Sequence, residues 1–221
     1  MKLFILRHGE TEPNTRGSLQ GWMDAPINEN GRMLAVLTGR AMKGIRFDHC
    51  ISSPLARARE TAEIILRESK NTADIRFDDR LREIGFGEME GKSIAEMGEE
   101  GDKLSTDPFH YVGFPNGESI ADVCRRTQSF LKELIAEDDG KTYLISTHGC
   151  AMRAMINYLL DDPSDYWCGH VPYNCSFTII EAKGGKARIT EMDKVYYDRS
   201  MIVDHFKTIT KTDYSIRPEE D

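Results

Sequence analysis

The sequence predicts an α/β fold, namely a doubly wound, mostly parallel sheet with helices on both faces and an antiparallel edge. Short apolar segments of strand length alternate with amphipathic segments of helix length along most of the chain, which is typical of parallel strands joined by helices. Near the end, two strand-like segments are separated by Gly184-Gly185, which predicts a hairpin at the sheet edge. The 221 residues are interpreted as one domain.

The first third of the chain is expected to supply three strands and two helices. Asn28 is a candidate N-cap for the first helix, and Ser53-Pro54 places a serine cap and a first-turn proline before the second. A polar loop rich in glycine and proline is expected before Asn28. In chain order we expect strand 2–6, helix 30–43, strand 48–52, a helix from Ser53-Pro54 to about residue 67, and strand 75–77.

The periodic pattern fades between residues 80 and 119, where many glycines and prolines occur. A connection this long is usually functional or mobile, so we expect a loop excursion at about 90–118 over the active site, with one short helix at 93–97. Further along, the sequence predicts helix 120–136, strand 142–147, helix 150–159, and strands 176–182 and 186–192. The polar segment after about residue 195 is left unassigned.

Composition and charge exclude several classes of protein. The formal charge of −8 argues against a nucleic acid or an anionic membrane as a partner. An anionic substrate would therefore need a local basic cluster. No apolar run approaches the roughly 20 residues of a membrane helix, and the apolar start, residues 3–6, is too short for a signal peptide.

Cysteine usage indicates a reducing compartment. The five cysteines are odd in number and form no C-x-x-C, so we expect reduced thiols rather than a disulfide framework. The expected location is the cytoplasm. The sequence is also compatible with a homodimer.

Charged and nucleophilic side chains stand where the expected strands end. Arg7-His8 ends the first strand, and His148 ends strand 142–147. Ser52-Ser53 ends the second strand, with Arg57 one turn into the following helix. Because ligands of open α/β sheets bind beyond the carboxyl ends of the strands, we expect these residues to meet at one site.

The residue types at this edge suit a phosphomonoester. Arg7 and Arg57 can each present a planar, permanently charged fork to phosphate oxygens. The helix after His148 can add backbone N–H groups near Gly149 and Cys150. The two arginines should also lower the pKa of a neighbouring imidazole and keep it neutral. A metal site made by His8, His148 and Glu83 is disfavoured because the arginines would repel a cation, so neither a metal nor another cofactor is expected.

Several motifs resemble one known family. They are L-R-H-G-E-T (6–11), Asn14, Gln20-Gly21, I-N-E-N-G (27–31), S-S-P-L-A-R-A-R-E-T-A (52–62), L-R-E-I-G-F-G-E-M-E-G (81–91), P-N-G-E-S (115–119) and S-T-H-G (146–149). Together, and in this order, they resemble the signatures of the histidine phosphatase superfamily, also called the phosphoglycerate mutase-like family. The resemblance covers residues 3 to about 180. One departure is Met89, which stands where the family commonly has tryptophan.

The resemblance implies roles for individual residues. His8 would be the nucleophile that becomes phosphorylated, and His148 would donate to a phosphate oxygen. Glu83 matches the proton donor, although its spacing alone would favour a solvated loop carboxylate. Apolar flanking residues could raise the pKa of Glu83 towards the working range. Asn14, Gln20 and Gly21 match positions that contact phosphate or substrate, and the competing carboxylates nearby are Glu10, Glu88 and Glu90.

The function expected from this resemblance is hydrolysis of small phosphorylated metabolites. The first alternative is a cofactor-dependent phosphoglycerate mutase. The resemblance implies that such mutases carry extra basic residues that clamp the substrate, whereas residues 92–118 here contain only Lys92 and Lys103. The second alternative is a phosphate-binding regulatory module without catalysis. Sugar phosphates, phosphoserine, phosphoglycerates, nucleotide-biosynthesis intermediates and ribazole phosphate are all candidate substrates.

Two features of the excursion bear on substrate choice. Its apolar group of Phe109, Tyr111, Val112 and Phe114 would either wrap the organic part of a substrate or anchor the loop to the core. Its acids would disfavour substrates with a second negative group, which predicts a preference for monophosphates with neutral or aminated bodies. These acids are Glu96, Glu99, Glu100, Asp102 and Asp107.

The remaining histidines have no partner motif and are interpreted as structural or surface residues. They are His49, His110, His170 and His205.

Overall fold

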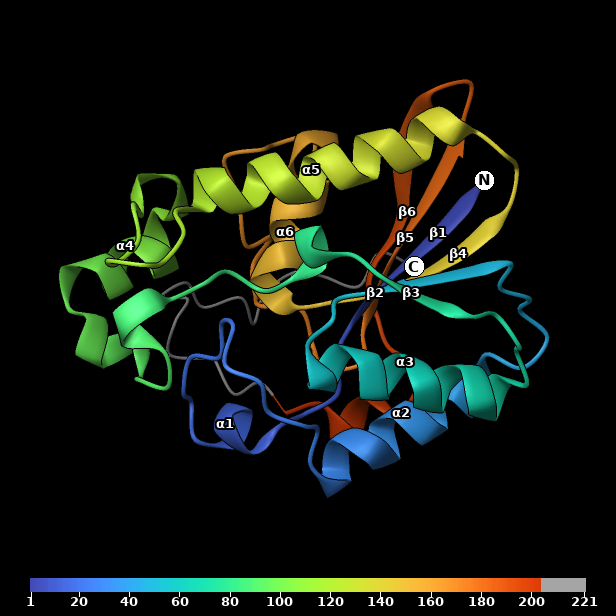
Figure 1. Ribbon diagram of the computed structural model, residues 1–221, viewed down its shortest axis with the longest axis horizontal. Helices are drawn as coiled ribbons and strands as arrows, with labels where there is room; N and C mark the ends of the chain where they lie inside the picture. Colours follow the sequence, from blue (N-terminus) through green and yellow to red (C-terminus); the bar gives the residue numbers. More distant parts are fainter. Residues whose placement is uncertain (204–221) are drawn as a thin grey trace.

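The computed structural model describes residues 1–203, which form a six-stranded sheet between two layers of helices (Figure 1). The strands lie in the order β3-β2-β4-β1-β5-β6. β3, β2, β4 and β1 pair in parallel, whereas β5 pairs antiparallel with both β1 and β6, so the expected fold class is confirmed. Their bounds are β1 (Lys2–Arg7), β2 (His49–Ser52), β3 (Ile75–Phe77), β4 (Thr142–Thr147), β5 (Phe177–Lys183) and β6 (Lys186–Lys194).

Helices cover both faces of the sheet (Figure 1). Helices α2 (Glu29–Ala41) and α3 (Ala56–Ser69) pack on one face, where Phe4 and Leu6 of β1 point. Helices α5 (Ile120–Glu137) and α6 (Gly149–Ile156) pack on the other, against Leu3 and Ile5. Because successive strand residues point to opposite faces, burial on both sides requires the continuous apolar run of β1.

Strand register brings the carboxyl ends of β1, β2 and β4 together. Arg7 pairs with Thr147, and Ser52 pairs with Ser146. The next residues continue the ladder, since the His8 N–H donates to the Thr147 carbonyl at 3.0 Å. His8, Ser53 and His148 therefore follow one another across the same edge of the sheet, as the sequence predicted.

Two short helices were not expected from the sequence. Helix α1 (Glu12–Thr15) interrupts the predicted polar loop, and its N-cap Thr11 forms a capping box with Asn14. Helix α4 (Glu99–Thr106) lies within the excursion, after the 3₁₀ turn Ile94–Met97 that matches the predicted short helix. Acidic residues fill the first turn of α4, where the helix dipole favours them.

The start of α3 also differs from the prediction. The helix begins at Ala56 with Leu55 as its N-cap, and its first N–H, that of Ala56, donates to the Asp24 carboxylate at 2.7 Å. Ser53 is therefore not the N-cap that the sequence predicted, although its hydroxyl accepts from the Leu55 N–H at 3.3 Å just before the helix. The hairpin prediction is confirmed: Gly184 and Gly185 have φ values of 60° and 71°, the left-handed pair that a two-residue turn between β5 and β6 requires.

The apolar residues of the excursion mainly anchor it. Tyr111, 1% exposed, and Phe114 belong to a core cluster with Ile120 of α5. Phe109 is 45% exposed and Val112 is 72% exposed. The interpretation that these residues anchor the loop therefore fits better than the one in which they wrap a substrate.

The remaining described segments carry little of the site. Beyond β6, Tyr197 is buried and its hydroxyl donates to the Asn174 carbonyl at 2.7 Å. His205 lies outside the described residues, as does most of the segment that the sequence left unassigned. Within residues 1–203, no helix combines the length and the apolarity needed to cross a membrane.

Candidate active site

His8 follows β1 directly and has its side chain in a defined tautomer. Its Nδ1 lies 2.7 Å from the Gly9 carbonyl oxygen. Since a carbonyl only accepts, Nδ1 carries the proton and Nε2 keeps a lone pair. Burial lowers the pKa of His8 well below its ordinary value, and the charges of Arg57 and Arg7 lower it further. His8 is thus a neutral imidazole with nucleophilic Nε2.

His148 follows β4 and carries its proton on the opposite nitrogen. Its Nδ1 accepts from the Nε–H of Arg57 at 3.1 Å, so the proton resides on Nε2, which lies 2.8 Å from the Ser53 hydroxyl. Burial and the Arg57 charge lower the pKa of His148 well below its ordinary value. The rings of His8 and His148 have centroids 5.1 Å apart. The edge of the sheet therefore carries a nitrogen lone pair on His8, which lines the pocket, and an N–H on His148, which is fully buried, does not line the pocket and is paired with the Ser53 hydroxyl.

Arg57 lies fully buried behind these histidines rather than on the pocket surface. Its Nη1 donates to the Met23 carbonyl at 2.9 Å, and its Nη2 donates to the carbonyls of Gln20 at 3.0 Å and Gly21 at 2.8 Å. Burial lowers the pKa of Arg57 to about 10, which leaves it charged at neutral pH. In this structure Arg57 fixes His148 and segment 20–23.

Glu90 binds the same segment from its amide side. Its carboxylate accepts from the N–H groups of Gly21 at 2.9 Å, Trp22 at 2.8 Å and Met23 at 3.3 Å. Gly21 does not line the pocket, and a Cβ on it would overlap the Ile84 carbonyl oxygen. Glu90 is thus a structural carboxylate. Residue 21 is a glycine because the Ile84 carbonyl leaves no room for a side chain there.

Arg7 and Gly149 do line the pocket. Arg7 is buried and donates from Nη1 to the Pro172 carbonyl. A Cβ on Gly149 would lie 3.1 Å from Val171 and 3.5 Å from Arg7 Nε. The lack of a side chain at the start of α6 therefore leaves room for the guanidinium beside it.

Asn14 and Gln20, also predicted to bind phosphate or substrate, line the pocket too. Gln20 Nε2 donates to the Thr11 hydroxyl at 2.7 Å. Asn174 donates to the His8 carbonyl at 3.0 Å and to the Asn14 side-chain oxygen at 3.4 Å. Asn174 was not predicted as a site residue, because the irregular segment in which it stands carries only a weak family resemblance and no functional signature.

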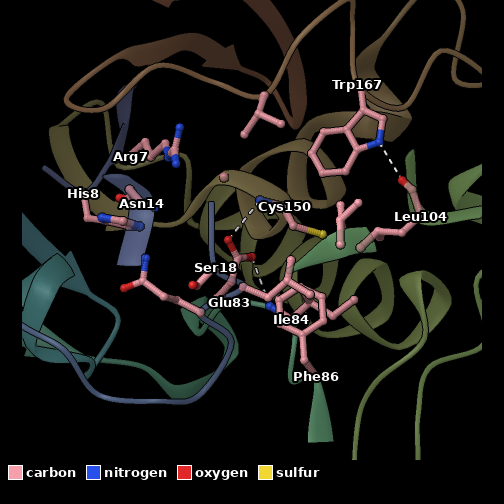
Figure 2. A pocket seen from close by; sticks show the side chains of 15 residues that line it. Arg7, His8, Asn14, Ser18, Glu83, Ile84, Phe86, Leu104, Cys150 and Trp167 are labelled. Carbon is pink, nitrogen blue, oxygen red and sulfur yellow. Dashed lines mark hydrogen bonds between the residues drawn. The ribbon is translucent and has the colours of Figure 1, made fainter. Parts of the chain in front are cut away.

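Glu83 lies in the same pocket and holds the start of α6 (Figure 2). Its Oε1 accepts from the N–H groups of Ile84 at 3.0 Å and Ala151 at 2.9 Å, and its Oε2 accepts from Cys150 at 3.1 Å. The Cys150 N–H, expected to face phosphate, is thus paired with Glu83 here. The N–H groups of Cys150 and Ala151, which have no partner within α6, thereby hold the Glu83 carboxylate in place.

An ion pair supports the segment that carries Glu83. Arg126 of α5 donates to the carbonyls of Arg80, Arg82 and Glu83 at 2.7–2.9 Å. The same guanidinium contacts both carboxylate oxygens of Glu118 at 2.7 and 2.8 Å. The sequence analysis missed this pair. The sequence did contain an indication of this ion pair: Glu118 of P-N-G-E-S precedes α5, and Arg126 lies about two helical turns further along.

The pocket has a polar end and an apolar wall (Figure 2). The aromatic residues of segment 109–114 are absent from its lining, and so are the five acids of the excursion. The lining residues are Arg7, His8, Asn14, Ser18, Leu19, Gln20, Glu83, Ile84, Phe86, Ile94, Leu104, Gly149, Cys150, Trp167 and Val171.

Other titratable residues lie apart from this site. His49 packs on the Tyr143 ring, His110 pairs with Asp107 at the surface, and His170 stacks on Tyr173. Among residues 1–203, no three histidine, cysteine or acidic side chains are grouped to hold a metal ion. All five cysteines are free.

Sequence and structure comparisons agree on one family. The model of the histidine phosphatase superfamily, branch 1, matches residues 3–194. A Salmonella arizonae protein named "Probable phosphoglycerate mutase GpmB" is 30% identical over 167 residues, which cover 74% of this chain and 77% of that protein.

Solved structures extend the similarity. YhfR of Bacillus stearothermophilus has 33% identity and a TM-score of 0.80, covering 88% of this chain and 97% of its own. An Entamoeba histolytica phosphoserine phosphatase, solved with 3-phosphoglyceric acid, has 28% identity and a TM-score of 0.76 over the same shares. This chain belongs to branch 1 of the histidine phosphatase superfamily.

Proposed function

We propose that this chain is a phosphatase that hydrolyses phosphomonoesters of small metabolites through a phosphohistidine on His8. The observation that carries the proposal is the pair of buried neutral histidines in opposite tautomers, at the ends of β1 and β4. One offers a lone pair and the other an N–H, beside the Arg7 cation. Phosphoryl transfer needs this combination of a nucleophile and fixed donors.

In the first step, Nε2 of His8 attacks phosphorus and forms the N–P bond while the bond to the ester oxygen breaks. Arg7, the Gly149 N–H and the Nε2–H of His148 stabilise the charge on the remaining oxygens. Glu83 gives a proton to the leaving alkoxide. Its Oε1 already accepts two backbone hydrogen bonds and its Oε2 accepts one, so Oε2 has the lone pair that best accommodates this proton.

In the second step, a water molecule attacks the phosphohistidine. The Glu83 carboxylate takes a proton from that water as the new P–O bond forms. The N–P bond breaks, and its electron pair returns to Nε2 of His8. The sum of both steps is ester plus water giving alcohol plus phosphate, with both side chains restored.

The charges of the pocket favour hydrolysis over the mutase alternative. A phosphoglycerate carries a carboxylate that would require a second cation. Among the described residues that line the pocket, Arg7 is the only arginine or lysine. Lys92 pairs with Glu96 at 3.9 Å, and Lys103 pairs with Glu100 at 2.7 Å, outside the pocket.

The cytoplasmic location stays a prediction.

Trapping the intermediate tests this function. Acid-labile, alkali-stable phosphate should appear on His8 during turnover, and His8→Ala should lower kcat/KM by several powers of ten. His110→Ala, a change at the surface, should have no effect. Phosphate on a serine or cysteine would contradict the mechanism, and 3-phosphoglycerate isomerisation faster than phosphate release would favour the mutase. Absence of any turnover would favour the non-catalytic module.

A further inference from the structure

One side of the pocket is a continuous apolar wall beside the reacting groups. Its side chains come from four segments that are far apart in sequence: the loop after α1, the segment after Glu83, the excursion, and the loop between α6 and β5. The members are Leu19, Ile84, Phe86, Ile94, Leu104, Trp167 and Val171.

This wall is built into the core. The indole Nε1–H of Trp167 donates to the Leu104 carbonyl at 2.9 Å, which joins the excursion to the loop after α6 (Figure 2). The Trp167 ring also packs edge-on against Tyr166 at 4.9 Å. Both Leu104 and Trp167 are buried in the same cluster as Phe86. A wall fixed in this way is available before a ligand arrives.

Charged groups near the wall are already paired. Among the described residues, Glu83 is the only acid that lines the pocket, and its carboxylate accepts hydrogen bonds from the first turn of α6. Glu96 accepts from Ser93, and Glu100 pairs with Lys103, both away from the pocket. An ammonium or carboxylate on a substrate would therefore lose water without gaining a counterion at the wall, which is unfavourable.

We infer, on the basis of the proposed function, that the site selects phosphomonoesters whose organic part is uncharged and largely apolar, such as a linear or branched alkyl group. The phosphate occupies the polar end near His8 and Arg7, and the alkyl part lies along Leu104 and Trp167. This differs from the expectation drawn from the sequence, because aminated bodies are disfavoured together with acidic ones.

A series of straight-chain alkyl phosphates from ethyl to hexyl tests the inference, since their leaving groups are chemically alike. Each buried methylene should raise kcat/KM roughly fourfold until the wall is covered. Hexyl phosphate should exceed both 6-aminohexyl and 5-carboxypentyl phosphate by at least about tenfold. A flat series, or a charged ester that equals hexyl phosphate, would overturn the inference.

A charge placed on the wall should change this preference. Ile94, only partly buried, lines the pocket, and Ile94→Lys should raise kcat/KM for 5-carboxypentyl phosphate relative to hexyl phosphate. Val112→Lys makes the same change on an exposed residue of the excursion and should leave that ratio unchanged. Equal ratios in both variants would contradict the assignment.

The same measurements separate the two proposals. Hydrolysis of p-nitrophenyl phosphate with phosphate trapped on His8, but a flat alkyl series, would overturn the substrate inference and leave the phosphatase standing. Loss of hydrolysis with every ester would overturn both. Thermal unfolding of Ile94→Lys and Val112→Lys distinguishes altered selectivity from a damaged fold.

Discussion

Arg57 donates its Nε–H to Nδ1 of His148 across 3.1 Å, inside a region where both side chains are fully buried. A permanent cation at this nitrogen prevents a second proton from binding there. The remaining ring proton is consequently held on Nε2, on the far side of the ring. The helix that follows β2 thus sets the protonation state of the residue that follows β4.

Replacement of Arg57 by lysine should weaken this arrangement. Lysine keeps the charge but lacks the planar fork that reaches His148 and the carbonyls of segment 20–23 at once. We expect kcat to fall about a hundredfold, in line with the loss of one positioned donor, with a smaller change in KM. Arg59→Lys, on the exposed side of α3, is the matched control and should be neutral.

Acid should destabilise the protein through its buried histidines. The folded-state pKa values of His8 and His148 lie well below 6.5, whereas an unfolded histidine titrates near 6.5. Below pH 6.5 the unfolded state therefore binds more protons, so the free energy of unfolding falls as pH decreases. Each histidine contributes a slope of up to about 1.4 kcal/mol per pH unit.

Urea unfolding between pH 7.5 and 5 measures this slope. His8→Gln should show a shallower dependence than the unchanged protein, whatever its stability at pH 7.5. His110→Gln, at an exposed site, should keep the full dependence. Parallel curves for His8→Gln and the unchanged protein would contradict the assignment of a neutral His8.

Glu83→Gln should affect poor leaving groups selectively. An alkoxide needs a proton as it departs, whereas p-nitrophenolate leaves without one. We expect the pre-steady-state rate of phosphohistidine formation to fall by about two to four powers of ten with an alkyl phosphate and to change little with p-nitrophenyl phosphate. Steady-state turnover of both esters should slow, because Glu83 also activates the water of the second step. Glu88→Gln, at an exposed carboxylate, is the control. Equal losses in the rate of phosphohistidine formation from both substrates would assign the role of proton donor elsewhere.

Arg126 should act through Glu83 as a positioning residue. Arg126→Lys loses several of the donors that hold segment 80–83, so the rate of phosphohistidine formation from alkyl phosphates should fall about tenfold, whereas the rate from p-nitrophenyl phosphate should be retained. Arg125→Lys, at the exposed neighbouring arginine, should change neither substrate. A purely structural role would lower both rates together.

Activity should survive EDTA, because the proposed steps use side-chain donors and no metal ion. Vanadate should inhibit by adopting a geometry similar to that of the transition state. Rates with and without chelator, followed by readdition of zinc or magnesium, check the first expectation. Restoration by either metal would show that the mechanism is incomplete.

The sequence predicted the sheet and its functional edge well because both depend on local patterns. The apolar strands end directly in Arg7-His8 and in His148, so parallel pairing alone brings these residues together. Helix α1 was missed although Thr11 and Pro13 marked its start, because only one turn of helix follows. Helix α4 was missed because the glycines around it obscure its periodicity.

Other parts of the site depend on contacts that no local pattern encodes. Ser53 was assigned a capping role, but its hydroxyl lies 2.8 Å from Nε2 of His148, 95 positions along the chain. The sequence left open whether residues 109–114 wrap the substrate or anchor the loop, and it gave no sign of the wall that includes Leu104 and Trp167, which are joined by a hydrogen bond across 63 positions. Only tertiary packing determines which of several apolar groups faces the substrate.

The hydrogen bond between Trp167 and the Leu104 carbonyl joins the excursion to the loop between α6 and β5, and neither segment contains His8, His148 or Glu83. The part of the wall made by Leu104 and Trp167 is therefore encoded apart from the reacting groups, whereas Ile84 and Phe86 directly follow Glu83. Substitutions at Ile94 or Leu104 can reshape the wall while Glu90 still holds segment 20–23 and Glu118 still pairs with Arg126. This separation makes residues 91–117 a natural target for directed evolution of substrate preference.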